Sequence, residues 1–421
     1  MSWGLADQAV SSLTNFAVGI VVARSLGAVE FGAFGLAWVT YGVVLNLCRG
    51  LATDPLLVRF SGVERMSWRA AVAQVSGSAV VLGAVAGGGS VLVGALLGGT
   101  VGSAFVALGL VLPALMLQDS WRYAFFAAGR GRSAFANDLV WGVALVPALL
   151  VADREPSVFG FVLAWGVAAG AAALCGWMQS RVMPRPGGTW RWLVEHRELG
   201  VRYMLENVSI SGASQLRMYG LGALAGLAAV GTVRGAELLL GPFMAVLMGL
   251  SNVAVPEASR VVRRRPRGLP LFCLVLGGAQ AGVALLWGLG LLLLLPDSWG
   301  RFVLGDVWPT ASALILPATL SVMFASISAG AAAGVRALGA ARLSLRAQTW
   351  ASLAYATGGL VGAALGGARG SAWGVATATF IGAVVWWVQL RSGHRVHLRP
   401  PLPRTTRSAP PLGTARGEET S

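Results

Sequence analysis

The sequence predicts an all-α polytopic membrane protein with about twelve transmembrane helices, arranged as two six-helix bundles related by a pseudo-twofold axis. The first observation is composition: of 421 residues, 56% are hydrophobic and only 12% are charged, with a mean hydropathy of +0.69. A soluble domain is about 25% charged. The second is a series of apolar stretches about 20 residues long, enough to cross a bilayer. The third is a weak internal repeat.

Apolar stretches of this length follow one another along the chain up to residue 391. The first lacks a basic leader and a small-residue cleavage site, so we expect an uncleaved helix. The stretches at 70–97 and 269–296 are long enough to tilt in the bilayer. The expected spans are residues 5–25, 31–51, 70–97, 103–127, 134–152, 158–180, 202–225, 231–253, 269–296, 309–333, 344–366 and 371–391.

These spans divide the chain into an N-terminal six-helix lobe at 1–181 and a C-terminal six-helix lobe at 202–391, joined by a cytoplasmic linker at 182–201. Residues 392–421 combine five Pro with Arg, Ser and Thr. Such a composition cannot bury an apolar core. We therefore expect a disordered cytoplasmic tail, rich in Arg and Pro.

Arg is distributed unevenly between the two sides of the predicted membrane. All 32 basic residues are Arg, and the formal net charge is +15. If the N-terminus is cytoplasmic, 26 of them fall in the inner connections and the tail, and only four in the outer connections. Basic residues accumulate on the cytoplasmic side, so we predict that both termini are cytoplasmic. The Arg263–Arg265 cluster is then an anchor beside anionic lipid, and we expect no nucleic acid partner.

The second half of the chain repeats features of the first in the same order. Gly27 and Gly32 match Gly226 and Gly231 at an offset of 199 residues, and the triplet Leu-Pro-Ala at 112–114 recurs at 316–318. Six helices per half place both halves the same way round in the membrane, related by an axis along its normal. In proteins built this way the substrate path lies between the halves, and alternating access comes from rocking one against the other.

Several function classes are excluded by what the sequence lacks. Without Lys there is neither a Walker phosphate loop nor a Schiff-base enzyme. The three cysteines lie far apart in apolar stretches, which suits neither disulfides nor a zinc site. The three histidines fall on the predicted cytoplasmic side and build no catalytic triad. We expect no enzyme and no cofactor; energy would come from a proton or sodium gradient.

Polar residues inside predicted spans are the candidate functional residues, because charge in a membrane usually faces a cavity or a partner. In the first span Asp7, Ser11 and Asn15 recur every four residues and share one helix face, which would line a central cleft. A carboxylate in the first turn can equally be a helix cap. The repeat partner of Asp7 is Glu206. Arg217 is a buried cation that needs an anion, either a bound phosphate or a carboxylate on another helix.

Two further pairs place an acid and an Arg three residues apart: Asp119 with Arg122, and Arg234 with Glu237. Such neighbours can form ion pairs on one helix face. Mutual neutralisation without a transport role is one interpretation. In the other, Asp119 and Glu237 exchange their Arg for a coupling ion. We interpret Asp138 as a residue at the cytoplasmic start of its helix.

The opening stretch Asp7–Phe16, continuing through Ala23–Gly27 and Glu30–Gly32, resembles the first helix and turn of bacterial polysaccharide flippases. These are the Wzx-like (O-antigen) branch of the multidrug/oligosaccharidyl-lipid/polysaccharide exporter superfamily, which also holds multidrug extruders and the lipid II flippase. The turns at Gly129–Arg132 and Gly334–Gly339 are similar to cytoplasmic turns of that family. The resemblance covers the architecture of most of the chain, but its motifs are confined to 7–35, 127–133 and 330–340.

The resemblance implies a flippase in the bacterial cytoplasmic membrane that moves a lipid-linked oligosaccharide, of the undecaprenyl pyrophosphate type, to the outer leaflet. Its partners would be that glycan, membrane lipids, and glycan polymerase and glycosyltransferases. It implies that Arg217, with Arg24 and Arg234, binds the pyrophosphate or an acidic sugar. An ion-coupled drug or metabolite antiporter of the same fold is the alternative. A major-facilitator transporter lacks support, because the loop after the second span reads Asp54–Phe60 without that family's glycines.

Overall fold

The structure is a computed structural model that describes residues 2–398, excepting the side chains of residues 2–6, 8–9, 210 and 245–253. Within that range the chain forms helices and no strand, which confirms the all-α prediction. The first half contains α1 (Ser2–Ser25), α2 (Ala28–Cys48), the π-helical turn η1 (Arg49–Thr53), α3 (Asp54–Phe60), α4 (Arg65–Leu97), α5 (Gly99–Ala127), α6 (Gly131–Ala152) and α7 (Val158–Ser180).

The linker contains η2 (Pro186–Gly188) and α8 (Thr189–Glu195). The second half contains α9 (Arg197–Ala225), α10 (Leu227–Leu239), α11 (Gly241–Arg264), η3 (Pro266–Gly268), α12 (Leu269–Leu293), α13 (Asp297–Leu304), η4 (Gly305–Val307), α14 (Trp308–Ser312), α15 (Ile315–Ala337) and α16 (Ala341–His397).

Eight helical segments of the described chain are long and apolar enough to cross a membrane, and one of them, α16, is interrupted by non-helical backbone at Gly366 and Gly367. Its two arms match two expected spans. Three expected spans are not among these eight segments. They fall on α1, on α9 and on the α10–α11 pair, and these helices contain polar groups or side chains that are not described. The chain is a multi-pass membrane protein.

Three expected boundaries were wrong. The span at 231–253 is broken at Leu240, and a new helix begins at Gly241 with Pro242 in its first turn. The span at 309–333 is divided between α14 and α15. The predicted tail starts later than expected, since α16 continues to His397; residues 399–421, where disorder was predicted, lie outside the described residues.

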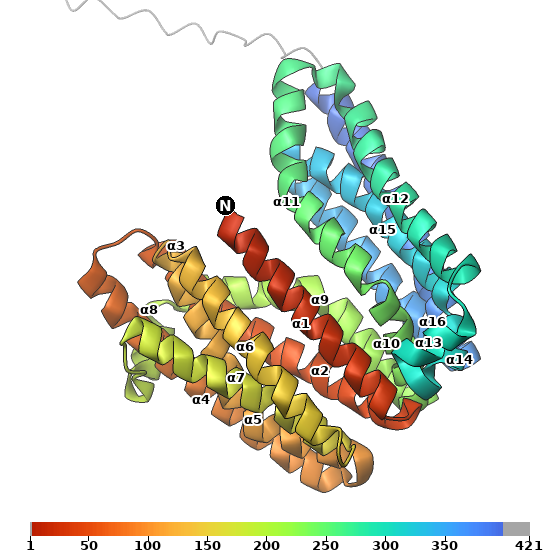
Figure 1. Ribbon diagram of the computed structural model, residues 1–421. Coiled ribbons are helices and arrows are strands. Elements are labelled where there is room, and N and C mark those ends of the chain that lie inside the picture. Colours follow the sequence, from red (N-terminus) through yellow and green to blue (C-terminus); the bar gives the residue numbers. More distant parts are fainter. Residues whose placement is uncertain (1, 399–421) are drawn as a thin grey trace, which may run out of the picture.

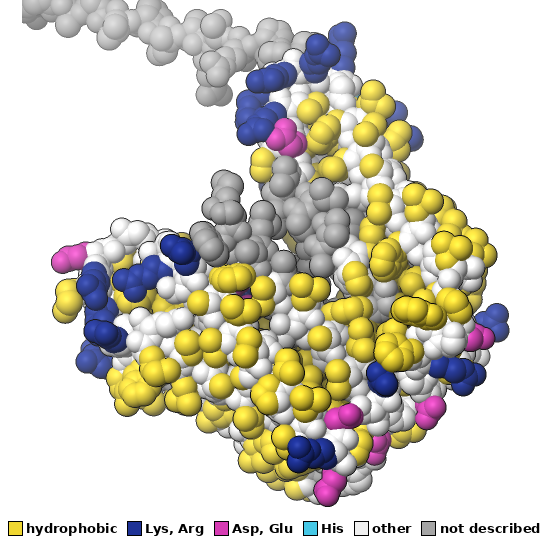
Figure 2. Space-filling model, in the orientation of Figure 1, with side chains coloured by type: hydrophobic (Ala, Val, Ile, Leu, Met, Phe, Trp, Pro, Cys, Tyr) yellow, Lys and Arg dark blue, Asp and Glu magenta, His cyan; other side chains and the backbone are white. Residues whose placement is uncertain are grey.

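The two halves form two elongated bundles that meet at one end and diverge toward the other, with the start of α1 between them (Figure 1). Arg side chains gather at the far tips of both bundles, and apolar side chains cover the flanks between (Figure 2). The spacings Gly83-Gly87 and Gly358-Gly362 bring helices into close approach: a Cβ on Gly87 would lie 2.4 Å from the Gly109 carbonyl oxygen.

The halves touch through α2, which packs against α9 and α10. The contact is reciprocal. A Cβ on Gly32 would lie 1.9 Å from the Leu227 carbonyl oxygen, and one on Gly231 would lie 2.2 Å from the Ala28 carbonyl oxygen. Gly32 and Gly231 are 199 residues apart, and so are Ala28 and Leu227, which is the offset of the repeat. This symmetry is what a pseudo-twofold axis running between α2 and α10 requires.

Candidate functional site

Most of the buried charge lies in two groups. The first, here the N-terminal network, contains Asp7, Arg49, Asp119, Arg122 and Asp138. The second, here the junction triad, contains Arg217, Arg234 and Glu237, beside the contact between the halves.

Four elements of the first half bring the N-terminal network together. Asp7 on α1 receives hydrogen bonds from Arg122 on α5, with Nε at 2.7 Å from Oδ2. Arg49 is the first residue of the π-helical turn η1. Its Nε and Nη2 donate to the two carboxylate oxygens of Asp119, at 3.0 and 2.6 Å. A two-pronged arrangement of this kind is the strongest form of an Arg–carboxylate pair.

Asp138 on α6 completes the network. Its Oδ2 lies 3.5 Å from Nε of Arg122, and its Oδ1 accepts a hydrogen bond from Gln118 at 2.9 Å. The three carboxylates are 0 to 5% exposed. With all groups ionised, three carboxylates face two guanidiniums, so the network has one negative charge without a partner among its own members.

Two of the sequence-based interpretations were wrong here. Asp119 was expected to pair with Arg122 on its own helix, but the guanidinium that binds it comes from Arg49, because α2 continues through η1, which contacts α5. Asp138 was expected at the cytoplasmic start of a helix, but it is 2% exposed and shares Arg122 with Asp7. Asp7 was expected either to cap its helix or to line a cleft; in the structure it is buried and paired with Arg122.

In the junction triad, Nη2 of Arg217 donates to Glu237 at 2.5 Å and Nη1 of Arg234 donates to the other carboxylate oxygen at 3.3 Å. The expected Arg234–Glu237 pair is therefore confirmed. Arg217 has a carboxylate on another helix as a partner, one of the two anions considered for it. The Arg217 side chain is almost fully buried, packed over the ring of Tyr355 and against Gly359, where a Cβ would come within 2.6 Å of it.

The junction triad differs from the network in charge and access. Two guanidiniums and one carboxylate give it a net charge of +1. The side chain of Glu237 is 37% exposed and that of Arg234 25%. The Nε–H groups of Arg217 and Arg234 have no hydrogen-bond partner among the described atoms. The triad thus offers unused donors.

Hydrogen bonds line the junction between α2–α3 and α9. Thr40 bonds Tyr219 at 2.7 Å, and Asn46 donates to Ser211 at 2.9 Å. Near the basic end, Asn207 donates to Asp54 at 2.9 Å. The junction therefore combines close glycine contacts with side-chain hydrogen bonds between the two halves.

The remaining predicted site residues are not gathered with the triad. Arg24 is exposed at the end of α1, with its guanidinium 4.6 Å from the ring centre of Phe302 on α13. Glu206 is exposed, whereas Ser11 and Asn15 are partly buried on α1. In the part of the chain that the structure describes, no three His, Cys, Asp or Glu side chains are placed to hold a metal ion.

Sequence reasoning missed Arg49 and underrated Asp138. The available signal for Arg49 was the run from Leu51 to Phe60, which stays apolar enough for the helix to continue. No signal in the sequence indicates the π-helical turn, which inserts one residue and alters the direction of the following side chains.

No family model and no curated protein matches the chain. Solved structures do. The lipid II flippase MurJ in an inward closed conformation is 12% identical, over 94% of this chain and 89% of its own, with a TM-score of 0.71. An inward-facing multidrug resistance MATE family transporter of the MOP superfamily is 14% identical, over 92% and 95%, with a TM-score of 0.68. An outward-facing MATE structure is also 14% identical, over 93% and 94%, with a TM-score of 0.53. This chain has the fold of those transporters.

Proposed function

We propose that this membrane protein is a flippase that moves a lipid-linked oligosaccharide of the undecaprenyl pyrophosphate type across the bacterial cytoplasmic membrane by alternating access. The fold it shares with a lipid II flippase and with multidrug transporters supports transport between two lobes, at residues 1–181 and 202–391. Both termini would be cytoplasmic, because the Arg-rich tips lie on one side. A glycan polymerase and glycosyltransferases would be its partners.

The observation that carries the proposal is the positive excess of the junction triad. Guanidinium groups bind phosphate oxygens through paired hydrogen bonds, and Arg217 and Arg234 have free Nε–H donors beside the contact between the lobes. The Glu237 side chain is 37% exposed, and an ionised carboxylate does not face lipid, so in this proposal Glu237 faces a water-filled space between the lobes. A pyrophosphate entering that space would compete with Glu237 for both cations.

Coupling would use the N-terminal network. Asp7 and Asp138 share the single guanidinium of Arg122, so one of their two buried negative charges is not balanced, which is unfavourable. Binding a proton or a sodium ion removes the imbalance. Asp138, which shares Arg122 with Asp7, is thus the proposed coupling group, whereas Arg49 holds Asp119 and Glu237 holds Arg217 until the substrate arrives.

The shape of the molecule supports an inward-facing state. The lobes diverge toward the Arg-rich tips (Figures 1 and 2), and the similarity is higher to the inward-facing MATE structure than to the outward-facing one. Substrate would enter from the cytoplasmic leaflet in this state.

The test is a flipping assay in proteoliposomes, with a fluorescent polyprenyl pyrophosphate oligosaccharide and an impermeant quencher. Arg234→Gln should lower the flipping rate by about tenfold or more, because it removes a hydrogen bond from a charged group to the substrate. Arg260→Gln is the matched control, because it removes an exposed Arg that also pairs with a Glu three residues away. Equal rates in the two variants would overturn the triad as the substrate site.

The alternative function is an ion-coupled antiporter of drugs or small metabolites. The observation that favours it is the acidic excess of the N-terminal network, which suits cation exchange. In the same proteoliposomes, uptake of a lipophilic cation driven by a proton or sodium gradient, with no flipping of the labelled lipid, would establish the antiporter and dismiss the flippase.

A further inference from the structure

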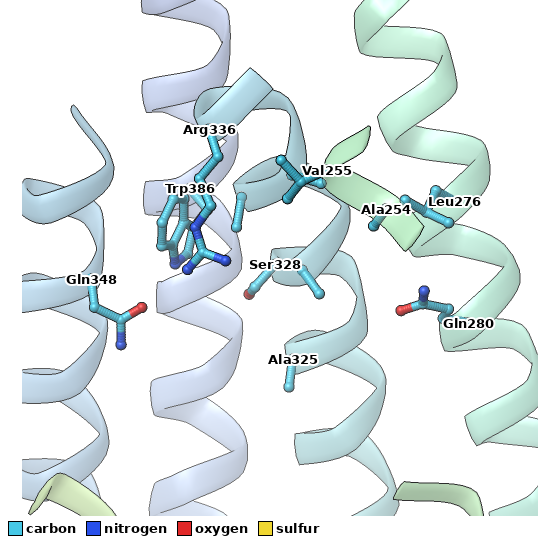
Figure 3. Close-up of a pocket in the computed structure, with 12 residues that line it drawn as sticks. Ala254, Val255, Leu276, Gln280, Ala325, Ser328, Arg336, Gln348 and Trp386 are labelled. Atoms are coloured by element: carbon cyan, nitrogen blue, oxygen red, sulfur yellow. The ribbon is translucent and has the colours of Figure 1, made fainter. Parts of the chain in front are cut away.

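The C-terminal lobe contains a cavity of about 240 Å³ between α11, α12, α15 and both arms of α16 (Figure 3). None of the residues of the N-terminal network or the junction triad lines it. Its walls combine small residues of α15 with a few polar side chains and the indole of Trp386. It is therefore a separate space from the site described above.

One buried polar group in this cavity lacks a partner. Gln280 is 4% exposed, and its Oε1 has no hydrogen bond among the described atoms. Leaving such a group unsatisfied costs about 1–3 kcal/mol. Ser328 and Gln348 are also on the wall; the Ser328 hydroxyl donates to the Phe324 carbonyl at 2.9 Å and one Gln348 N–H donates to Ser352 at 3.1 Å, which leaves the oxygens of both side chains able to accept.

Arg336 supplies the charge. It lies in the last turn of α15, and Figure 3 shows its guanidinium extended along Trp386 toward Ser328. No described carboxylate is within ion-pair distance of it; Glu257 of α11 is paired with Arg260. The cavity therefore presents one guanidinium, several hydrogen-bond acceptors and one aromatic wall, with no acidic side chain on its lining.

This set of groups defines a ligand. The guanidinium suits an oxyanion, because it binds phosphate oxygens in pairs. The acceptors of Gln280, Ser328 and Gln348 require hydroxyl donors on the same ligand. Cavities for drug-sized molecules measure about 300–1,000 Å³, so this one holds a head group and not an oligosaccharide.

We propose that the C-terminal lobe has a second binding site, for a phosphate ester carrying hydroxyl groups, held by Arg336 and Gln280 against Trp386. The glycerol phosphate of a membrane lipid and a soluble phosphate ester share this chemistry. The site is independent of which substrate crosses the membrane, because it lies apart from the junction triad.

The experiment measures ligand binding to the purified full chain by native mass spectrometry, with glycerol 3-phosphate as the soluble probe and phosphatidylglycerol as the lipid probe. Wild-type protein should bind one molecule saturably. Arg336→Gln should weaken binding by about tenfold or more, the value of a charge-assisted hydrogen bond. Arg346→Gln, an exposed Arg of the same basic tip outside the cavity, should leave it unchanged.

A second variant keeps Arg336 and fills the space instead. Ala325 lines the cavity, and Ala325→Phe should block binding with the charge retained. Saturable binding of phosphatidylglycerol alone assigns the site to a lipid head group, and competition by glycerol 3-phosphate assigns it to soluble esters as well. The proposal is overturned if neither probe saturates, if Arg346→Gln weakens binding as much as Arg336→Gln, or if Ala325→Phe binds normally. None of these results depends on the flipping assay.

Discussion

The N-terminal network and the junction triad are both built from Arg and acidic side chains, but they differ in net charge and in exposure. The network has more carboxylates than guanidiniums and is closed, with Asp7 at 0% and Asp138 at 2% exposure. The triad has more guanidiniums than carboxylates and is partly open at Glu237. A closed acidic group can exchange only a proton or a small cation, whereas an open basic group can meet a large anion. Net charge and access together distinguish the site that we propose for coupling from the site that we propose for substrate binding.

The largest effect is expected when the network loses its central cation. Arg122→Gln leaves Asp7 and Asp138 buried with no guanidinium at the same place, and breaking a buried ion pair costs about 3–5 kcal/mol. The yield of folded protein and its melting temperature should fall sharply. The double variant Asp7→Asn/Arg122→Gln should recover part of the loss. Wild-type stability of Arg122→Gln would show that the network is not a unit.

The next effect concerns the triad and is a loss of transport. Arg217→Ala should reduce the flipping rate by about a hundredfold, which corresponds to about 2.7 kcal/mol in activation free energy. Stability should fall less than in Arg122→Gln, because Glu237 keeps its ion pair with Arg234. Arg217→Lys is the companion variant: it keeps the charge but loses the paired donors, so we expect an intermediate rate. Normal export by Arg217→Ala would remove Arg217 from the substrate site.

The junction between the two regions can be tested through its glycines. Gly32→Ala would place a methyl group against the backbone of α10 and should cost about 1–3 kcal/mol. Gly27→Ala is the matched control, since a Cβ there meets nothing within 4 Å and φ is −70°. Equal melting temperatures of the two variants would contradict the reciprocal contact.

A smaller effect on stability, but a specific one on coupling, is expected at Asp138. Asp138→Asn removes the unmatched negative charge and keeps a side chain of the same size. The free energy of unfolding should therefore change by less than about 1 kcal/mol. Transport should lose its dependence on the proton or sodium gradient. Asp119→Asn should instead destabilise the protein, because Arg49 loses its paired acceptor. If Asp138→Asn retains the gradient dependence, the coupling role of the network is wrong.

The smallest effect is expected at Arg24. Its guanidinium lies over Phe302 at the opposite end of α1 from Asp7, and exposed substitutions usually change stability within about 0.5 kcal/mol. Arg24→Gln should transport and melt as the wild type does. A loss of flipping by this variant would restore Arg24 to the substrate path, as the sequence resemblance implied.

The sequence predicted the helices well because membrane crossing leaves a strong apolar pattern, and it predicted the lobes' relation because repeated glycines mark a contact that tolerates no side chain. It predicted Arg234–Glu237 because the two residues are neighbours on one helix. It could not choose between Arg49 and Arg122 as the partner of Asp119, since that choice depends on a π-helical turn and on how α2 packs against α5. Spacing along one helix shows which pairs can form, whereas competition from other helices decides which do.

The pair between Asp7 and Arg122 also bears on how the protein is made. The two residues are separated by 115 positions, so four further helical segments must be synthesised before the carboxylate on the first helix can meet its cation on the fifth. Until then a lone carboxylate opposes the stable burial of α1 in lipid. We therefore expect α1 to settle in the membrane only once α5 has been made.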